Sequence, residues 1–230
     1  MSSRVVDRNR RKGGKKQVKR HIIDALRRSE RRKIPYETFH LSEVLSPPIC
    51  SFLSELQIEP PVLGNTDGTR DSYNDKRLFI TPEIRTKYSG FDELAQAFQR
   101  PDVAHQFEKT LGIKLINESY LRMEYIQDTD GMWLEPHRDV PDKLFSMVLY
   151  LCTGPEAKDW GTDIYDDQKR WVGRSQADFN TAVIFRAGPN TWHGFEPRPI
   201  IGIRRLMEIN YVQNWRDIEQ LSFPDEKIIC

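Results

Sequence analysis

The stretch "WLEPHRDVP", residues 133–141, carries a histidine and an aspartate two positions apart, shortly before a run of alternating apolar residues. Side chains two apart in an extended segment point to the same side of the chain. His137 and Asp139 therefore present an imidazole and a carboxylate together. This arrangement suits two ligands of a metal ion at one strand end, and it equally suits two solvated polar groups beside a turn. The sequence on either side decides between these interpretations.

The segments around this stretch have the composition of β-strands. They are rich in β-branched and aromatic residues and alternate between two faces. They are "YLRMEYI" (120–126), "FSMVLYLC" (145–152), "TAVIFRA" (181–187) and "GIRRLMEINYV" (202–212). Turn-forming pieces such as "DTDG" and "AGPN" separate them. An antiparallel β region is therefore predicted from about residue 117 onward.

Helices are predicted before this β region. In "LSPPICSFLSEL" (45–56), Ser46 is placed to cap a helix whose first turn accepts the two prolines that follow. In "FDELAQAFQRPDVAHQFEKTLG" (91–112), the helical pattern is interrupted at Pro101 and ends at Gly112. The order of helices first and strands afterwards predicts an α+β, mainly β domain, a sandwich or barrel supported by N-terminal helices.

Composition limits the class of protein. The chain has 230 residues and 38% hydrophobic residues, enough for one sizeable core without disulfide bonds. The cysteines Cys50, Cys152 and Cys230 are odd in number and widely spaced, which favours a reducing compartment over a disulfide framework. The sequence shows no apolar run long enough for a membrane span and no secretory signal. We expect a cytoplasmic protein.

The charges are distributed unevenly along the chain. Residues 1–33 hold fourteen Lys or Arg and three Asp or Glu, a net charge of +11, so the remaining 21 basic and 31 acidic residues give −10. We expect a disordered start over 1–14 and a basic amphipathic helix over 15–32, followed by one domain over 34–230. The apolar stripe of that helix is Val18, Ile22, Ala25 and Leu26. It either packs on the acidic body or lets the leader bind an acidic partner or nucleic acid.

Two residues downstream complete a set that has a specific chemistry. His193 lies in a turn after the strand "TAVIFRA", and two histidines with one carboxylate can hold Fe(II) while leaving three coordination positions open. Arg204 lies in an otherwise apolar strand, where an arginine is costly unless it pairs with an anion. A bound dicarboxylate supplies that anion, and Tyr150 is placed to donate a hydrogen bond to it.

The spacing His137-Arg138-Asp139, then His193, then ten residues and Arg204 resembles the Fe(II)- and 2-oxoglutarate-dependent dioxygenases, and most of all their prolyl-4-hydroxylase-like branch. The resemblance implies a double-stranded β-helix (a cupin-like jelly roll). It implies that His137, Asp139 and His193 bind iron, and that Arg204 and Tyr150 bind 2-oxoglutarate. The implied cofactors are Fe(II), 2-oxoglutarate and O₂, with ascorbate as an optional reductant. Arg205 is the alternative to Arg204, since only one of the two can face inward on an alternating strand.

The implied reaction is hydroxylation of an unactivated C–H bond, with release of succinate and CO₂. A small metabolite such as an amino acid, a sugar-linked unit or a secondary-metabolism intermediate is the first hypothesis for the substrate. A protein substrate of the prolyl type is the second, and a non-catalytic jelly-roll binding module is the third. The repair of alkylated nucleic acid is disfavoured, because that family carries a second arginine six residues after the first and Asn210 stands there. Five residues are candidates for substrate contact: Arg122, Trp133, Arg138, Asp163 and Trp192.

Overall fold

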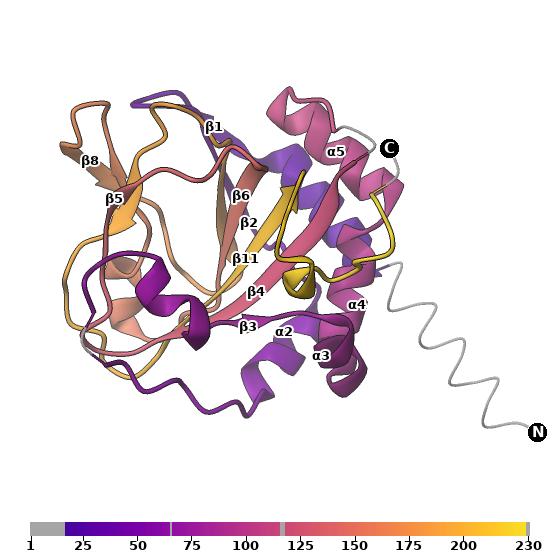
Figure 1. Cartoon of the computed structure of the whole chain (residues 1–230), viewed down its shortest axis with the longest axis horizontal. Coiled ribbons are helices and arrows are strands. Elements are labelled where there is room, and N and C mark those ends of the chain that lie inside the picture. Colours follow the sequence, from indigo (N-terminus) through magenta and orange to yellow (C-terminus); the bar gives the residue numbers. More distant parts are fainter. Residues whose placement is uncertain (1–16, 65, 116–117, 229–230) are drawn as a thin grey trace, which may run out of the picture.

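The computed structural model describes residues 17–64, 66–115 and 118–228. Its centre is a large antiparallel sheet, faced on one side by helices and on the other by a smaller sheet (Figure 1). In order across it, the larger sheet consists of β1 (Glu30–Arg32), β2 (Thr38–Ser42), β9 (Thr181–Phe185), β6 (Lys143–Tyr150), β11 (Arg204–Val212), β4 (Tyr120–Asp128) and β3 (Leu78–Phe79). The smaller sheet consists of β5 (Leu134–His137), β10 (His193–Phe195), β7 (Asp163–Tyr165) and β8 (Trp171–Arg174). Two facing antiparallel sheets of this kind form the predicted jelly roll.

The helices gather on one face of the large sheet (Figure 1). They are a helix described over 17–28, α2 (Pro47–Glu55), α3 (Pro82–Lys87), α4 (Ser89–Phe98) and α5 (Pro101–Leu111). The chain also contains three short 3-10 helices within its described part, η1 (Asp71–Lys76), η2 (Pro155–Asp159) and η3 (Ile218–Gln220). Within the described chain, no helix is both long and apolar enough to cross a membrane.

The alternation along β11 separates the two faces of the large sheet. Met207 and Ile209 are fully buried in the main hydrophobic core, which lies between the sheet and the helices. Arg204, Glu208 and Asn210 alternate with them and point toward the smaller sheet. Because strand side chains alternate with a period of two, the same strand supplies both the core and a polar interior.

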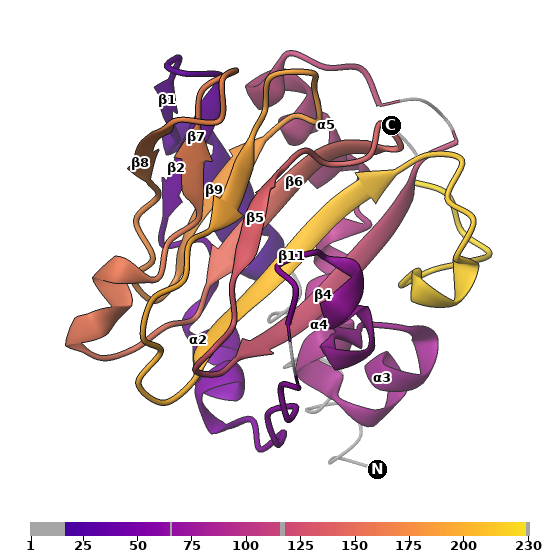
Figure 2. The same cartoon turned by 60° about the vertical axis from the view of Figure 1, so that its left-hand side comes forward.

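A second, smaller apolar cluster spans the space between the two sheets. It includes Ile126, Val183 and Leu206 from the large sheet and Ile164 from the small one. In Figure 2 the strand β5 lies in front of β6 and β11, with this space between them. The cluster closes one part of the jelly roll, and the polar interior occupies the rest.

The helix over 17–28 packs on the body. Its stripe of Val18, Ile22, Ala25 and Leu26 is at most 1% exposed and belongs to the main core. An ion pair between Lys19 and Asp102 on α5 adds to the attachment. The packing alternative is therefore confirmed for this helix. The disordered start expected over 1–14 lies outside the described residues.

Other sequence expectations are confirmed only in part. The break at Pro101 and the end at Gly112 are correct, since Pro101 begins α5 and Gly112 adopts the left-handed conformation at φ 63°. Ser46 occupies the N-cap position of α2, but its side chain makes no capping hydrogen bond. The order of helices before strands was wrong, because β1, β2 and β3 precede or interrupt the helices and pair into the large sheet. These strands are only two to five residues long, too short for a clear periodic pattern.

Candidate active site

His137 and His193 face each other on neighbouring strands. They are register partners in the β5–β10 ladder, and their ring centroids lie 4.4 Å apart. The His137 Nδ1 lies 2.8 Å from the Glu135 carbonyl oxygen, and the His193 Nδ1 lies 3.0 Å from the Thr191 carbonyl oxygen. A carbonyl can only accept, so in each ring Nδ1 is the donor and Nε2 keeps its lone pair. Backbone carbonyls orient metal-binding histidines in this way.

Burial also sets the protonation of His137. Its pKa is lowered to about 3, first by burial and then by the neighbouring His193. The imidazole is therefore neutral at pH 7. A neutral imidazole is the form that binds a metal ion.

Asp139 completes the group from the loop after β5. Its Oδ2 lies 3.8 Å from the His193 Nε2 and accepts a hydrogen bond of 2.7 Å from the Ser146 hydroxyl. Its Oδ1 accepts a hydrogen bond of 2.7 Å from the Lys143 ammonium. Burial raises the pKa of Asp139, but Lys143 and His193 outweigh it and hold the pKa below the usual range. Asp139 is therefore an anion.

These three side chains offer the right donor atoms for iron but do not already enclose a site. Within the described residues, no group of three or more His, Cys, Asp or Glu side chains is close enough to hold a metal ion as it stands. Ligand atoms about 2.1 Å from one ion lie roughly 3–3.5 Å apart, so the 3.8 Å between His193 and Asp139 is slightly wide. Asp139 Oδ2 has a lone pair left beside its bond to Ser146. The donor chemistry fits Fe(II), with Oδ2 as the carboxylate ligand.

A cavity of about 60 Å³ lies beside these residues, between the two sheets. Its wall includes His137, Asp139, His193 and Arg204, with Phe185 among the apolar residues. The volume exceeds that of a single water site several times over. The candidate iron ligands and the predicted anion-binding arginine therefore meet at one space.

Of the two neighbouring arginines, Arg204 is the one whose side chain faces inward. It is 5% exposed and lines the cavity. Its Nε donates to the Trp160 carbonyl oxygen at 2.7 Å, and its Nη1 forms an ion pair with Asp128 on β4. Because Asp128 already pairs with this guanidinium, a bound dicarboxylate would share the Arg204 guanidinium with Asp128.

Tyr150 is placed differently from its predicted role. It is fully buried, and its hydroxyl lies 2.6 Å from both the Thr162 and the Ser175 hydroxyl oxygens. Thr162 lines the cavity and Tyr150 does not. The structure therefore places Thr162 at the cavity wall, with Tyr150 holding it from behind.

The five candidate substrate residues separate into two groups. Arg122 is buried and lines a second cavity next to the first. Arg138 and Trp192 lie at the rim, where the Arg138 guanidinium carbon stacks 4.6 Å from the Trp192 ring centroid.

The other two residues lie away from the cavities. Asp163 is 0% exposed and is bound by Trp171, Arg174 and the Glu196 amide, so its carboxylate is a structural anchor of the small sheet. The Trp133 ring packs against Gly68, where a Cβ atom would lie 2.2 Å from the ring. Neither lines a cavity of the described site.

Sequence reasoning missed a buried ion-pair cluster behind the site. It joins Asp139, Glu124 and Glu208 to Lys143, Arg70, Arg77 and Arg122. A signal was present, because Arg122, Glu124 and Glu208 fall on the same alternating face as Arg204 in two strands that were correctly predicted. Arg70 and Arg77 come from an irregular segment, for which the sequence offers no periodic pattern.

Known structures share this architecture. A prolyl 4-hydroxylase structure from Phytophthora capsici matches with a TM-score of 0.56 at 13% identity, over 87% of this chain and 65% of that one. A prolyl hydroxylase from Trichoplax adhaerens, solved with a peptide of hypoxia inducible factor, matches with a TM-score of 0.57 at 12% identity, over 86% and 90% of the two chains. A 2OG-Fe(II) oxygenase family oxidoreductase from Burkholderia pseudomallei matches with a TM-score of 0.53 at 13% identity, over 84% and 90%.

The fold is that of the 2OG-Fe(II) oxygenases. No family model matches the sequence, and no curated protein matches it either. At 12–13% identity the likeness lies in the arrangement of the strands. The chain spans just under two thirds of the Phytophthora capsici structure and most of the other two. The oxygenase fold confirms the double-stranded β-helix that the sequence predicted.

Proposed function

We propose that the chain is an Fe(II)- and 2-oxoglutarate-dependent oxygenase that hydroxylates a C–H bond of a small molecule. One observation carries the proposal: two oriented imidazoles, a buried carboxylate and an inward-facing arginine line the same cavity in an oxygenase fold. Each feature alone has a structural explanation. Their conjunction in one space matches the chemical requirements of this reaction.

His137, Asp139 and His193 would hold the iron, and their three positions leave the remaining coordination sites open. When bound, Fe(II) with 2-oxoglutarate and O₂ supplies an oxidant for C–H bonds, with succinate and CO₂ as co-products. Arg204 would bind the distal carboxylate of 2-oxoglutarate, and Thr162 is placed to donate to it from the cavity wall. Phe185 and Leu206 form an apolar part of the same wall, which would keep water from the bound cosubstrate.

A small substrate is supported by the shape of the site. The cavity next to the candidate iron ligands has a volume of about 370 Å³, within the range of small-molecule pockets. The likeness to prolyl hydroxylases keeps a peptide substrate as the second candidate. We also propose a cytoplasmic location, since Cys50 and Cys152 are both free thiols.

The decisive experiment measures succinate formation and Fe(II) binding by the purified chain with 2-oxoglutarate. We expect His137→Ala to abolish succinate formation and to weaken Fe(II) binding in an equilibrium metal assay. A matched control is His105→Ala, which removes an exposed histidine on α5 far from the cavity. If His137→Ala and His105→Ala bind Fe(II) equally well, the iron assignment is wrong.

The same assay separates enzyme from binding module. Adding low-mass and high-mass fractions of host extract in turn shows which fraction stimulates succinate formation. Stimulation by the low-mass fraction supports a small substrate, and stimulation by the high-mass fraction alone supports a macromolecular one. Fe(II) binding without succinate formation under any condition favours the non-catalytic module.

A further inference from the structure

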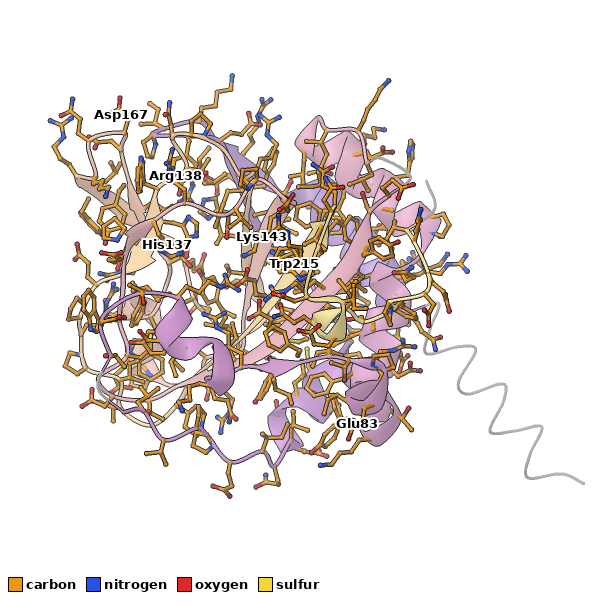
Figure 3. The ribbon with its side chains drawn as sticks, viewed as in Figure 1. Glu83, His137, Arg138, Lys143, Asp167 and Trp215 are labelled. Carbon is orange, nitrogen blue, oxygen red and sulfur yellow. The ribbon has the colours of Figure 1, made fainter. Side chains whose placement is uncertain are left out.

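A second cavity opens directly beside the cavity of the proposed iron site. The two cavities share Arg70, His137 and Asp139, so a molecule in the second would reach the candidate iron ligands. Its other walls include Arg122, Lys143 and Trp215. Figure 3 shows Lys143 and Trp215 near one another in the middle of the molecule, with His137 and Arg138 toward the smaller sheet.

The charges of the ion-pair cluster beside this cavity do not cancel. Among the described residues, the ion-pair cluster contains four basic and three acidic side chains, a net charge of +1 if all are ionised. Arg70, which lines the cavity, is the basic side chain of the four that is partly exposed, at 24%. The carboxylate oxygens of Glu124 and Glu208 accept hydrogen bonds from arginines and Lys143, and neither carboxylate lines the second cavity. An ion bound to Asp139 would raise the uncompensated charge. An excess, partly exposed cation at the wall of a cavity attracts an anionic ligand.

Hydrogen-bond donors point the same way. Arg122 uses Nε on Gln220 and Nη1 on Glu124 and Asn210, and it lies between the rings of Phe79 and Trp215. The Trp215 Nε1 is buried and has no hydrogen-bond partner among the described residues. A buried donor without a partner costs free energy that a bound acceptor recovers.

Of the acidic residues that line the cavity, Asp139 is buried and paired with Lys143, and the other two lie at the outer edge. Glu135 and Asp217 are exposed, whereas Arg122 and Lys143 are 2% and 3% exposed. The floor of the cavity is therefore cationic and rich in donors. Its aromatic side comes from Trp215, whose ring favours a ligand with a flat or apolar body.

We infer that this second cavity binds a small molecule through its carboxylate, with Arg70, Arg122 and Trp215 as the residues that bind the anion. The rest of the ligand extends toward His137 and into the first cavity, which Arg204 lines. That the ligand is the molecule oxidised rests on the proposed function. That the cavity selects carboxylates does not, since the excess positive charge and the donors are present without any metal.

The test compares matched acids and amides with the metal-free protein in the absence of 2-oxoglutarate. The probes are phenylacetate, indole-3-acetate and N-acetylphenylalanine, each beside its primary amide, and ligand-observed NMR gives the dissociation constants. We expect each acid to bind at least about tenfold more tightly than its amide, because a hydrogen bond to a charged group contributes more than a neutral one. Acids and amides that bind equally, or acids that fail to bind at millimolar concentration, would overturn the inference.

Variants locate the effect. Arg70→Gln removes the excess charge and should erase the preference for acids, whereas Arg70→Lys should keep it. Arg100→Gln makes the same charge change at an exposed remote site and should leave the preference intact. Trp215→Phe keeps an aromatic ring but removes the donor, so it should weaken the acids several-fold and the amides less, because a hydrogen bond to a charged acceptor is the stronger one. An Arg70→Gln protein that stays folded and still prefers acids contradicts the inference.

Failure of this inference differs from failure of the proposed function. Arg204→Gln should lose 2-oxoglutarate binding while retaining the preference for acids in the second cavity. If the acids bind as expected but no succinate forms under any condition, the carboxylate pocket stands and the oxygenase proposal fails. If succinate forms but acids and amides bind alike, the oxygenase proposal stands and the substrate class is wrong.

Discussion

Replacing Arg204 should affect stability and cosubstrate binding by separable amounts. The Arg204 and Asp128 side chains are each 6% exposed and form an ion pair. Arg204→Met leaves the Asp128 carboxylate buried without its guanidinium partner, which costs about 3–5 kcal/mol of the free energy of unfolding. The same change removes a charged hydrogen-bond donor to 2-oxoglutarate, a loss of about 1.5–3 kcal/mol, or roughly 10- to 100-fold in affinity.

The double variant Arg204→Met, Asp128→Leu separates these effects. With both charges gone the interior is apolar, so most of the lost stability should return. The affinity for 2-oxoglutarate should not return, because no cation faces the cavity from this position. Urea denaturation gives the stabilities, and titration calorimetry of the Fe(II)-loaded protein gives the affinities. Recovery of 2-oxoglutarate binding in the double variant, or its survival in Arg204→Met, would refute the role given to Arg204.

Three further changes test the fold around the site. The pKa of His40 is lowered to about 4, mainly by burial of its ring. The folded protein therefore loses stability as the pH falls from the unfolded pKa near 6.5 toward 4. His40→Gln should reduce the change in unfolding free energy between pH 7 and 5 by about 1 kcal/mol, since the ring is partly exposed. Gly161→Ala should lower Tm and 2-oxoglutarate affinity together, because the added Cβ would lie 1.8 Å from the Ser175 carbonyl oxygen beside Thr162, and an unchanged Tm would contradict this clash. Ile22→Ala should lower the free energy of unfolding by about 2–5 kcal/mol in urea denaturation, because Ile22 is fully buried in the main core, and a cost near zero would contradict this packing.

The sequence predicted the long strands best, because their side chains alternate regularly between the two faces of the sheet. The long strands β4, β6 and β11 follow from alternation over eight or nine residues. Alternation shows that only one of Arg204 and Arg205 faces inward, and the spacing of the resemblance favoured Arg204. The pairing of His137 with His193 could be expected only through the resemblance, since 55 residues separate them and no local pattern brings β5 and β10 together.

Other features of the site depend on tertiary contacts that leave no local signal. Tyr150 and Thr162 lie on different elements, and which of them reaches the cavity depends on how far each side chain extends between the sheets. The cluster around Glu208 draws Arg70 from a segment without regular periodicity. Asp163 resembles a site residue in sequence because buried anchors and binding groups use the same carboxylate.

The candidate iron ligands and Arg204 belong to different sheets. His137 and His193 lie on the small sheet, and Arg204 lies on β11 of the large one. The side chains between the sheets therefore set the distance that the proposed cosubstrate would have to span. Val183 and Leu206 have no reactive atoms, yet a change of one methylene in either would lengthen or shorten that distance. The distance between the candidate iron ligands and Arg204 therefore depends on apolar residues that have no role in the chemistry of the site.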